Sequence, residues 1–241
     1  MQKIGIVGQG FVGSAVYEGF KDHHQILRYD KYNTDRSDTD LEGLVENCDV
    51  IFVCVPTPMI AETGQASIHI VKEVVEDIDL IASDYDKTPT LVVKSTVPPG
   101  TIDYLNELTE YAEVTFNPEF LTERNAVKDY ENQNRIILGG PRPATTKLKQ
   151  IFSKVFPKAH IIKTDSTHAE MVKYLTNTFL STKVSFANEI YQICKVVGAD
   201  YDKVIEYATQ DERLGTSHWN VPGHDGDFGF GGHCFPKDLS A

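Results

Sequence analysis

The sequence has few of the features that mark secreted, membrane-spanning or zinc-binding proteins. Its 241 residues include only four cysteines, and no two of them are spaced as C-x-x-C. This argues against both a disulfide framework and a cysteine-based zinc site. No apolar run approaches the ~18 residues of a membrane span, and no signal-peptide core follows Met1. These absences predict a protein of a reducing compartment, the cytoplasm.

A block of basic residues is also missing. The chain carries 35 Asp and Glu residues against 23 Lys and Arg, which gives a formal net charge of −12 at pH 7. A surface of that sign repels polyanions, so we expect no nucleic-acid partner. A small anionic ligand remains compatible with this charge, because its site needs only a few backbone amides and local cations.

The first pattern with a chemical meaning is a glycine-rich turn near the N-terminus. An apolar segment leads directly into G-x-G-x-x-G at Gly8, Gly10 and Gly13. A second apolar segment, Gln25–Tyr29, ends at Asp30, about 20 residues after the first glycine, where a ribose-binding carboxylate is expected. Together they predict a βαβ fold that binds a dinucleotide. The predicted cofactor is NAD rather than NADP, because the carboxylate of Asp30 would repel a 2′-phosphate.

Alternating strand and helix patterns continue to residue 164 and predict a Rossmann-like α/β domain with a doubly wound parallel sheet. Strands are expected at 49–55, 90–94, 113–116, 135–138 and 160–163, and helices at 67–81, 101–111, 122–130 and 144–156. In such sheets ligands bind beyond the carboxyl ends of the strands. Three loops that contain proline occupy that position: residues 54–58, 94–100 and 117–123. Since each carries hydroxyls or carboxylates, they predict a site at one edge of the sheet.

Residues 165–197 contain neither proline nor glycine and predict one helix of ~50 Å. We expect its apolar stripe to be core: Val172, Leu175, Phe179, Phe186, Ile190, Ile193 and Val197. Lys173 and Asn177 are four residues apart and therefore share one face, with donors suited to a sugar hydroxyl or an alkoxide. Residues 165–241 are thus expected to form an all-helical second domain, and a helix of this length suits a dimer spine.

Near the end of the sequence, glycines flank Cys234 in residues 229–238, with Lys237 and Asp238 close behind. Glycines let the backbone approach a ligand closely, and a nearby cation favours the thiolate form of a cysteine. Cys234 is therefore the candidate nucleophile. The other cysteines lie among apolar residues and are expected to be buried and inert: Cys48, Cys54 and Cys194. The histidines near Cys234 match no familiar ligand spacing, so we predict no metal site.

The ordered series of motifs resembles the UDP-glucose/GDP-mannose dehydrogenase family over the whole chain, and within it the members that oxidise UDP-glucose. The series comprises GQGFVG, VPTP, KSTVPPGT, NPEFLTE, the helix with Lys173 and Asn177, DERLG and GFGGHCFPKD. The resemblance implies that a nucleotide-sugar primary alcohol is oxidised twice to a uronate, with two molecules of NAD. Full-length members continue into a C-terminal domain that binds the nucleotide, which we expect to be absent here.

The resemblance also implies a role for individual residues. Cys234 would capture the intermediate aldehyde as a thiohemiacetal, which then loses a hydride to give a thioester. Asp238 and Thr96 would position the water that hydrolyses it, and Glu119 would serve acid–base chemistry at that stage.

The remaining roles concern binding. Lys173 and Asn177 would hold the alkoxide or oxyanion, and Arg213 would reach the substrate of a neighbouring subunit in a homodimer built on helix 165–197. The expected cofactor contacts are Gly8, Gly10, Phe11, Val12, Gly13, Asp30, Thr57, Thr96, Glu123 and Lys237. The expected substrate contacts are Glu119, Phe120, Leu121, Lys173, Asn177, Arg213, Phe230 and Gly231.

Three alternatives stay open from the sequence. A relative that oxidises UDP-N-acetylmannosamine or GDP-mannose would use the same catalytic residues. A β-hydroxyacid dehydrogenase also combines a Rossmann domain with a Lys-x-x-x-Asn helix, but it does not need Cys234. A shortened chain that only binds NAD or a partner chain is the third.

Overall fold

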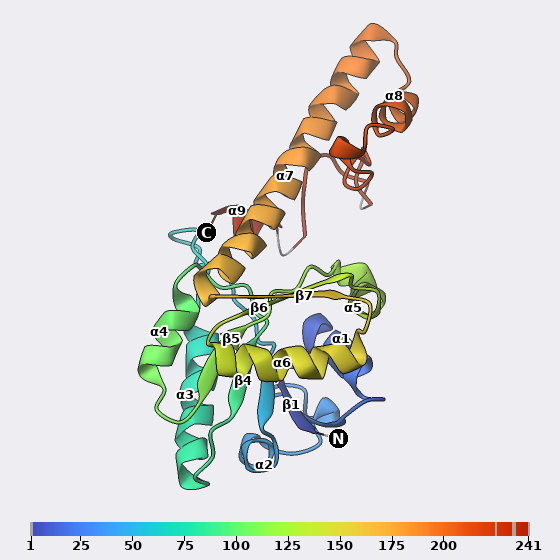
Figure 1. Ribbon diagram of the computed structural model, residues 1–241. Coiled ribbons are helices and arrows are strands. Elements are labelled where there is room, and N and C mark those ends of the chain that lie inside the picture. The colour runs from blue at the N-terminus through green and yellow to red at the C-terminus, as the bar shows by residue number, and fades with distance from the viewer. Residues whose placement is uncertain (1, 225, 233–234, 241) are drawn as a thin grey trace. The chain divides into compact units, whose positions relative to one another are not determined.

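The computed structural model describes residues 2–224, 226–232 and 235–240 (Figure 1). The chain forms two compact units, Met1–Lys173 and Tyr174–Ala241. The first is an α/β unit built on one seven-stranded sheet, and the described elements of the second are helical. Within the described residues, no helix combines the length and the apolar character that crossing a bilayer requires.

The strands of the first unit match the predicted strands to within two residues at each end. They are β1 (Lys3–Val7), β2 (Gln25–Tyr29), β3 (Val50–Val53), β4 (Thr90–Val93), β5 (Glu113–Phe116), β6 (Arg135–Gly139) and β7 (His160–Thr164). The helices are α1 (Phe11–Phe20), α2 (Leu41–Asn47), α3 (His69–Asp84), α4 (Thr101–Leu108), α5 (Ala126–Glu131) and α6 (Arg142–Val155), with short 3-10 turns η1 (Thr34–Arg36) and η2 (Glu123–Asn125). The sequence did not predict α2, and α5 begins later than expected.

The order of strands in the sheet is β2-β1-β3-β4-β5-β6-β7. Strand β1 pairs with β2 on one side and with β3 on the other, so the chain reverses its direction across the sheet between β1 and β3. In an open α/β sheet this reversal leaves a crevice beyond the carboxyl ends of the two strands, which is where ligands bind. The glycine-rich turn follows β1 at this point.

The direction of β6 corrects the prediction of a fully parallel sheet. Strand β6 runs antiparallel to β5, with Phe116 opposite Gly139, whereas β7 is parallel to β6. The connection from β5 to β6 contains the short turn η2 and the six-residue helix α5, which packs against α1 and does not cross back along the sheet (Figure 1). The chain therefore enters β6 from the same edge at which it leaves β5.

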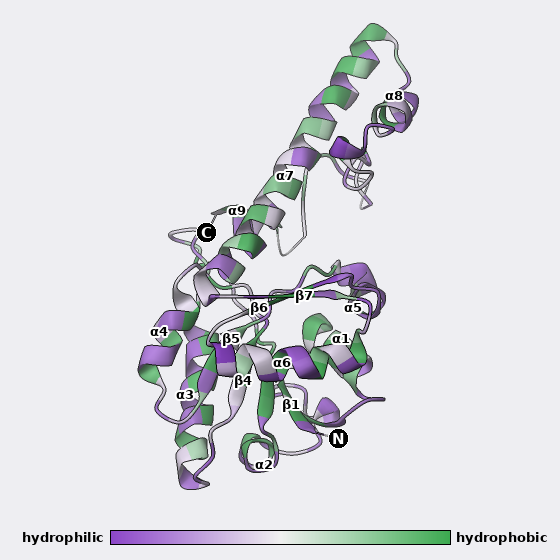
Figure 2. Ribbon diagram, viewed as in Figure 1, coloured by the Kyte–Doolittle hydropathy of each residue, from purple (hydrophilic) through white to green (hydrophobic). Residues whose placement is uncertain are grey.

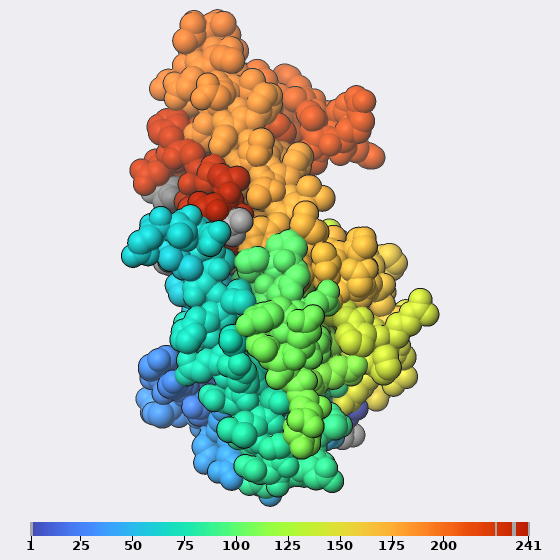
Figure 3. Space-filling view, turned by 90° about the vertical axis from the view of Figure 1, so that its left-hand side faces the viewer, coloured from blue at the N-terminus to red at the C-terminus, as the bar shows by residue number. Residues whose placement is uncertain are grey.

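Helices cover both faces of the sheet. Helices α2, α3 and α4 lie on one face, where α3 and α4 run side by side (Figure 3), and α1, α5 and α6 lie on the other. Strand β3 shows how the sequence supports this, because Ile51 and Val53 enter the first core while Val50 and Phe52 enter the second. Because both faces are buried, polar side chains that act on a ligand are restricted to the ends of the strands.

Helix α7 (Ser166–Val197) begins in the first unit and continues into the second, which also contains α8 (Tyr201–Ala208), η3 (Glu212–Leu214) and α9 (Phe235–Ser240). The prediction that the apolar stripe of α7 is core is wrong within one chain for most of its members, because Leu175 is 67% exposed and Phe179 is 64% exposed, whereas Val172 packs against the first core. Figure 2 shows this apolar character along α7. The helix buries a different face, and more than half of that face is polar: Ser166, Glu170, Lys173, Asn177 and Ser181 beside Ala169, Tyr174, Ala187 and Cys194.

Candidate active site

The fingerprint turn has the geometry of a dinucleotide site. Gly8 has φ +89°, and a Cβ there would lie 2.6 Å from the carbonyl oxygen of Cys54. A Cβ at Gly13 would lie 1.9 Å from the carbonyl oxygen of Gly8, so α1 could not pack so closely against the turn. A Cβ at Gly10 would meet no atom within 4 Å. The chain's own packing thus explains the first and third glycines, and the second is explained by the close approach of a pyrophosphate.

Asp30 lies at the end of β2 with its carboxylate held by three backbone amides. The amide of Gln9 donates to Oδ2 at 2.6 Å, and the amides of Tyr32 and Asn33 donate to Oδ1 at 2.9 Å each. These bonds fix the carboxylate beside the glycine-rich turn, which is the position that the ribose of a dinucleotide requires. The residues present therefore fit the cofactor.

Arg36 is a candidate that the sequence did not single out. Its guanidinium, in η1, donates to the carbonyl oxygen of Gln9 at 3.1 Å and lies 3.5 Å from Ser14 Oγ. It adds positive charge at the start of α1, where Phe11 and Val12 are the first helical residues and anions bind favourably. The sequence could have indicated Arg36 as a candidate, because it is an arginine shortly after Asp30, the acid that follows β2.

The three proline-containing loops meet at the carboxyl edge of the sheet. Ser95 Oγ donates to the carbonyl oxygen of Val55 at 2.6 Å and joins the loops after β4 and β3. Lys94 Nζ donates to Asn117 Oδ1 at 2.8 Å and joins the loops after β4 and β5. Burial lowers the pKa of Lys94 to about 8. The hydroxyl residues predicted to face the ligands, Thr57 and Thr96, are both buried on these loops.

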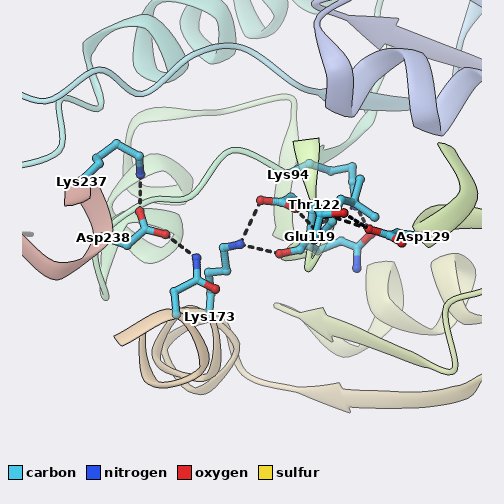
Figure 4. A network of polar contacts seen from close by, with 10 residues as sticks. Lys94, Glu119, Thr122, Asp129, Lys173, Lys237 and Asp238 are labelled. Carbon is cyan, nitrogen blue, oxygen red and sulfur yellow. Dashed lines mark hydrogen bonds and ion pairs between the residues drawn. The ribbon is translucent and has the colours of Figure 1, made fainter. Parts of the chain in front are cut away.

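A buried ion pair joins the start of α7 to the loop after β5 (Figure 4). Lys173 Nζ donates to the carbonyl oxygen of Glu119 at 2.6 Å and to its Oε1 at 2.9 Å, and the amide of Leu121 donates to Oε2 at 2.7 Å. The ring of Phe120 lies 5.5 Å from the ammonium. The two charged side chains are only 3% and 6% exposed. Burying such a pair brings little net stability, so a function is the better explanation of its position.

In the second unit, Asn177 and Asp238 form a matching contact between α7 and α9. Asn177 Nδ2 donates to Asp238 Oδ2 at 2.6 Å, and Lys237 forms an ion pair with the same carboxylate (Figure 4). Asp238 is 1% exposed. Lys173 and Asn177 lie one turn apart on α7, so their side chains share one face of that helix.

Other predicted site residues lie on exposed segments or outside the residues that the structure describes. Glu123 in η2 and Gly231 are exposed, and the ring of Phe230 lies 6.4 Å from that of Phe235. Arg213 is exposed and pairs with Asp211. The predicted nucleophile, Cys234, lies outside the described residues, as does the adjacent His233.

The other three cysteines are buried free thiols, as predicted: Cys48, Cys54 and Cys194. Burial raises the pKa of Cys48 to about 11 and that of Cys54 to about 12, so neither forms a thiolate at neutral pH. No three His, Cys, Asp or Glu side chains within residues 2–224, 226–232 and 235–240 are grouped so that they could hold a metal ion.

Comparison with known proteins agrees with the motifs. Residues 29–159 match the NAD binding domain of the UDP-glucose/GDP-mannose dehydrogenase family, and residues 167–241 match the central domain of that family. The UDP-glucose 6-dehydrogenase TuaD of Bacillus subtilis is 36% identical over 209 residues, which cover 84% of this chain and 43% of TuaD. The chain thus spans less than half the length of that relative.

Solved structures agree on the fold. A UDP-glucose dehydrogenase from the archaeon Pyrobaculum islandicum aligns with a TM-score of 0.86 at 29% identity, over 99% of this chain and 62% of that chain. A GDP-mannose dehydrogenase from Pseudomonas aeruginosa aligns with a TM-score of 0.77 at 28% identity, again over 99% and 62%. The Rossmann-type fold and NAD as the cofactor, both predicted from the sequence, are confirmed. The chain belongs to the UDP-glucose/GDP-mannose dehydrogenase family.

Proposed function

We propose that the protein uses NAD to oxidise the primary alcohol of a nucleotide sugar, UDP-glucose, to the carboxylate. The observation that carries the proposal is the buried pair of Lys173 and Glu119 at the carboxyl edge of a sheet whose first turn is a dinucleotide fingerprint. A relative named UDP-glucose 6-dehydrogenase and two structures of nucleotide-sugar dehydrogenases support this substrate class.

NAD, when bound, accepts the hydride that the substrate carbon loses in each oxidation. The Lys173 ammonium is buried and fixed, so it stabilises the negative oxygen of the reacting alcohol or hemiacetal without reorganisation of water. We assign to Asn177 a second hydrogen bond to that oxygen, because it lies one turn along the same helix face. Glu119 carries the proton at the hydrolytic stage.

The second oxidation needs a covalent step. The Cys234 thiolate adds to the aldehyde carbon and forms a thiohemiacetal, whose carbon then loses a hydride to give a thioester. Water, positioned by Asp238 and Thr96, attacks the thioester carbon, breaks the C–S bond and releases the acid and the thiol. Each acid formed therefore corresponds to two molecules of NADH. The buried free thiols of Cys48, Cys54 and Cys194, together with a thiolate mechanism, suit a reducing compartment such as the cytoplasm.

Replacement of Lys173 tests the assignment of the oxyanion. We expect Lys173→Met to lower kcat for UDP-glucose by roughly 10²- to 10³-fold, because a fixed cationic donor is lost where negative charge develops. The Kd for NAD, measured by fluorescence titration, should change little. Lys147→Met is the control, because Lys147 is a partly buried lysine at the opposite edge of the sheet, where its Nζ donates to the carbonyl oxygen of Asp49. Equal losses in the two variants would contradict the role of Lys173.

Replacement of Cys234 tests the covalent step. Because no thiohemiacetal can form, we expect Cys234→Ala to produce no uronate at an appreciable rate, whereas Cys234→Ser should form product slowly through an ester. Product analysis and the ratio of NADH to acid, expected to be two in the wild type, provide the measurement. Cys194→Ala serves as the matched control, since Cys194 is buried and has no role in the reaction. Normal acid production by Cys234→Ala would rule out the mechanism.

The preference for NAD should depend on Asp30. A 2′-phosphate would face the fixed carboxylate of Asp30, and such repulsion is worth about 1–3 kcal/mol, or roughly 10- to 100-fold in affinity. We therefore expect NADP to bind at least about tenfold more weakly than NAD. Asp30→Ala should narrow the ratio of the two Kd values, while Asp35→Asn, which changes a nearby exposed acid, should leave it unchanged. Tighter binding of NADP by the wild type would disprove the assignment.

We further propose a homodimer that packs on the exposed apolar stripe of α7. Met171 and the exposed members of the stripe recur every four or seven residues and so share one face: Leu175, Phe179, Phe186, Ile193 and Val197. Light scattering should give twice the chain mass of 26.9 kDa. Phe179→Glu with Phe186→Glu should give monomers, because both charges would enter the interface, whereas Lys195→Glu on another face of α7 should not. A monomeric wild type would overturn the proposal.

Arg213 links the dimer to the site. Its side chain is 88% exposed, so it is free of the core and can reach a neighbouring subunit. Mixing Arg213→Ala subunits with Cys234→Ala subunits should restore part of the activity, because each hybrid dimer contains one site with both residues. No recovery while subunits exchange would show that Arg213 acts within its own chain.

A further inference from the structure

Glu170 forms an unusual contact at the start of α7. Its side chain is fully buried, and its carboxylate accepts hydrogen bonds from the amide of Gly100 at 2.6 Å and from the amide of Ile102 at 2.9 Å. These amides belong to the N-terminus of α4. Gly100, the residue before α4, has φ +90° and no side chain, so the cap that a helix normally takes from its own first residue comes here from a distant helix.

The two amides also end the loop that carries Thr96. At the beginning of this loop, Lys94 is bonded to Asn117, and Ser95 is bonded to the loop after β3. Thr96 follows directly and is 9% exposed. Glu170 therefore lies outside the loop and binds its far end, four residues after Thr96.

We propose that Glu170 is a positioning residue that fixes residues 95–100 through the amides of Gly100 and Ile102, and thereby sets the place of Thr96 in the reaction. The effect of Glu170 on the reaction rests on the proposed function, whereas the hydrogen bonds by which Glu170 fixes residues 95–100 do not. Glu170 lies three residues before Lys173, so one helix face anchors the loop of Thr96 and the loop of Glu119.

A purely structural role explains this residue poorly. A buried carboxylate is expensive to desolvate, and a neutral serine or asparagine before α4 would cap the helix without that penalty. Asp79 of α3 provides a less buried comparison, because it binds backbone amides of the loop that follows α4. It is only partly buried and accepts hydrogen bonds from the amides of Tyr111 and Ala112 at 2.9 and 2.7 Å.

The titration of Glu170 gives the proposal a distinctive pH dependence. Burial raises the pKa of Glu170 to about 7, the amides at Gly100 and Ile102 oppose this, and the Asp103 carboxylate of α4 adds to it. On its own helix, the nearest ammonium is that of Lys173, which is bonded to Glu119. Above this pKa both oxygens accept an amide bond. The amides favour the charged form, so protonation of the still-buried carboxyl as the pH falls through about 7 weakens one of these bonds and should loosen the loop.

The variant Glu170→Gln keeps the shape of the side chain but replaces one acceptor by a donor that opposes an amide. We expect kcat to fall by roughly 10- to 100-fold with a smaller change in KM, because Thr96 is displaced in the transition state. The fall in wild-type kcat on the acidic side of about pH 7 should be absent in the variant. Hydrogen exchange of the Gly100 and Ile102 amides should become faster, and in the wild type it should lose protection below that pH.

Two further variants separate this role from general stability. Asp79→Asn also removes a carboxylate that binds backbone amides, so it should lower the melting temperature without changing the pH profile of kcat. In a Thr96→Ala background, Glu170→Gln should lower kcat much less than it does alone, because the two residues act as one unit. A full additional loss in that background, or an unchanged pH profile in Glu170→Gln, would overturn the proposal.

The exchange experiment distinguishes failure of this inference from failure of the proposed function. If the wild type does not oxidise UDP-glucose while Glu170→Gln exposes the Gly100 and Ile102 amides, the proposed function is wrong and the hold on the loop is supported. If the wild type is active and those amides stay protected in the variant, the positioning role is wrong and the function stands.

Discussion

The structure of the first unit depends on the buried polar face at the start of α7. Glu170 and Lys173 are both charged groups without access to water, and each is satisfied by a different loop at the carboxyl edge of the sheet. If either loop moved away, a buried charge would lose its partners, which typically costs about 3–5 kcal/mol for an ion pair. The positions of the two loops are therefore coupled to α7 more tightly than apolar packing alone would achieve.

The covered sheet explains why the polar groups gather at this edge. Both of its faces are packed with apolar side chains from helices, so an unpaired polar group along a strand would have no partner. At the carboxyl ends of the strands the chain turns, and the backbone amides and carbonyls of the loops become available. Gly8 shows how tight the packing is there, because its only tolerated side chain is a hydrogen atom against the backbone of Cys54.

Much of this arrangement could be predicted from the sequence, because it follows from local patterns. Buried strands are recognisable as runs of apolar residues. The glycines of the fingerprint are recognisable because close contacts in and around the first turn require them. The direction of β6 could not be predicted in this way, since it depends on α5 packing against α1. The spacing of apolar residues in α7 correctly indicated one apolar face. Such a spacing does not indicate which face of the helix the rest of the chain covers.

The candidate site residues also divide into those that a local sequence pattern identifies and those that depend on contacts between distant segments. Asp30 could be selected as a candidate because a known spacing links it to the glycines, and Lys173 could be selected as a candidate through its spacing to Asn177. Glu170 could not, because its partners lie 68 and 70 residues away in the sequence and are backbone amides, which leave no trace in the residue types. Its spacing of three residues to Lys173 was visible, but only the structure shows that both side chains are buried.

The loop of residues 94–100 is held at its two ends by groups that respond differently to pH. Burial lowers the pKa of Lys94 to about 8 and raises that of Glu170 to about 7, so both lose their charge near neutrality. A neutral lysine amine keeps two N–H donors, which are enough for its two bonds to Asn117. A protonated glutamic acid, in contrast, lacks one of the two acceptors that the α4 amides need. On the alkaline side, Lys94 loses one proton but keeps enough N–H groups for both of its bonds, so this end of the loop should stay fixed. On the acidic side, Glu170 gains a proton and one of its two accepting oxygens is weakened, so that end should loosen.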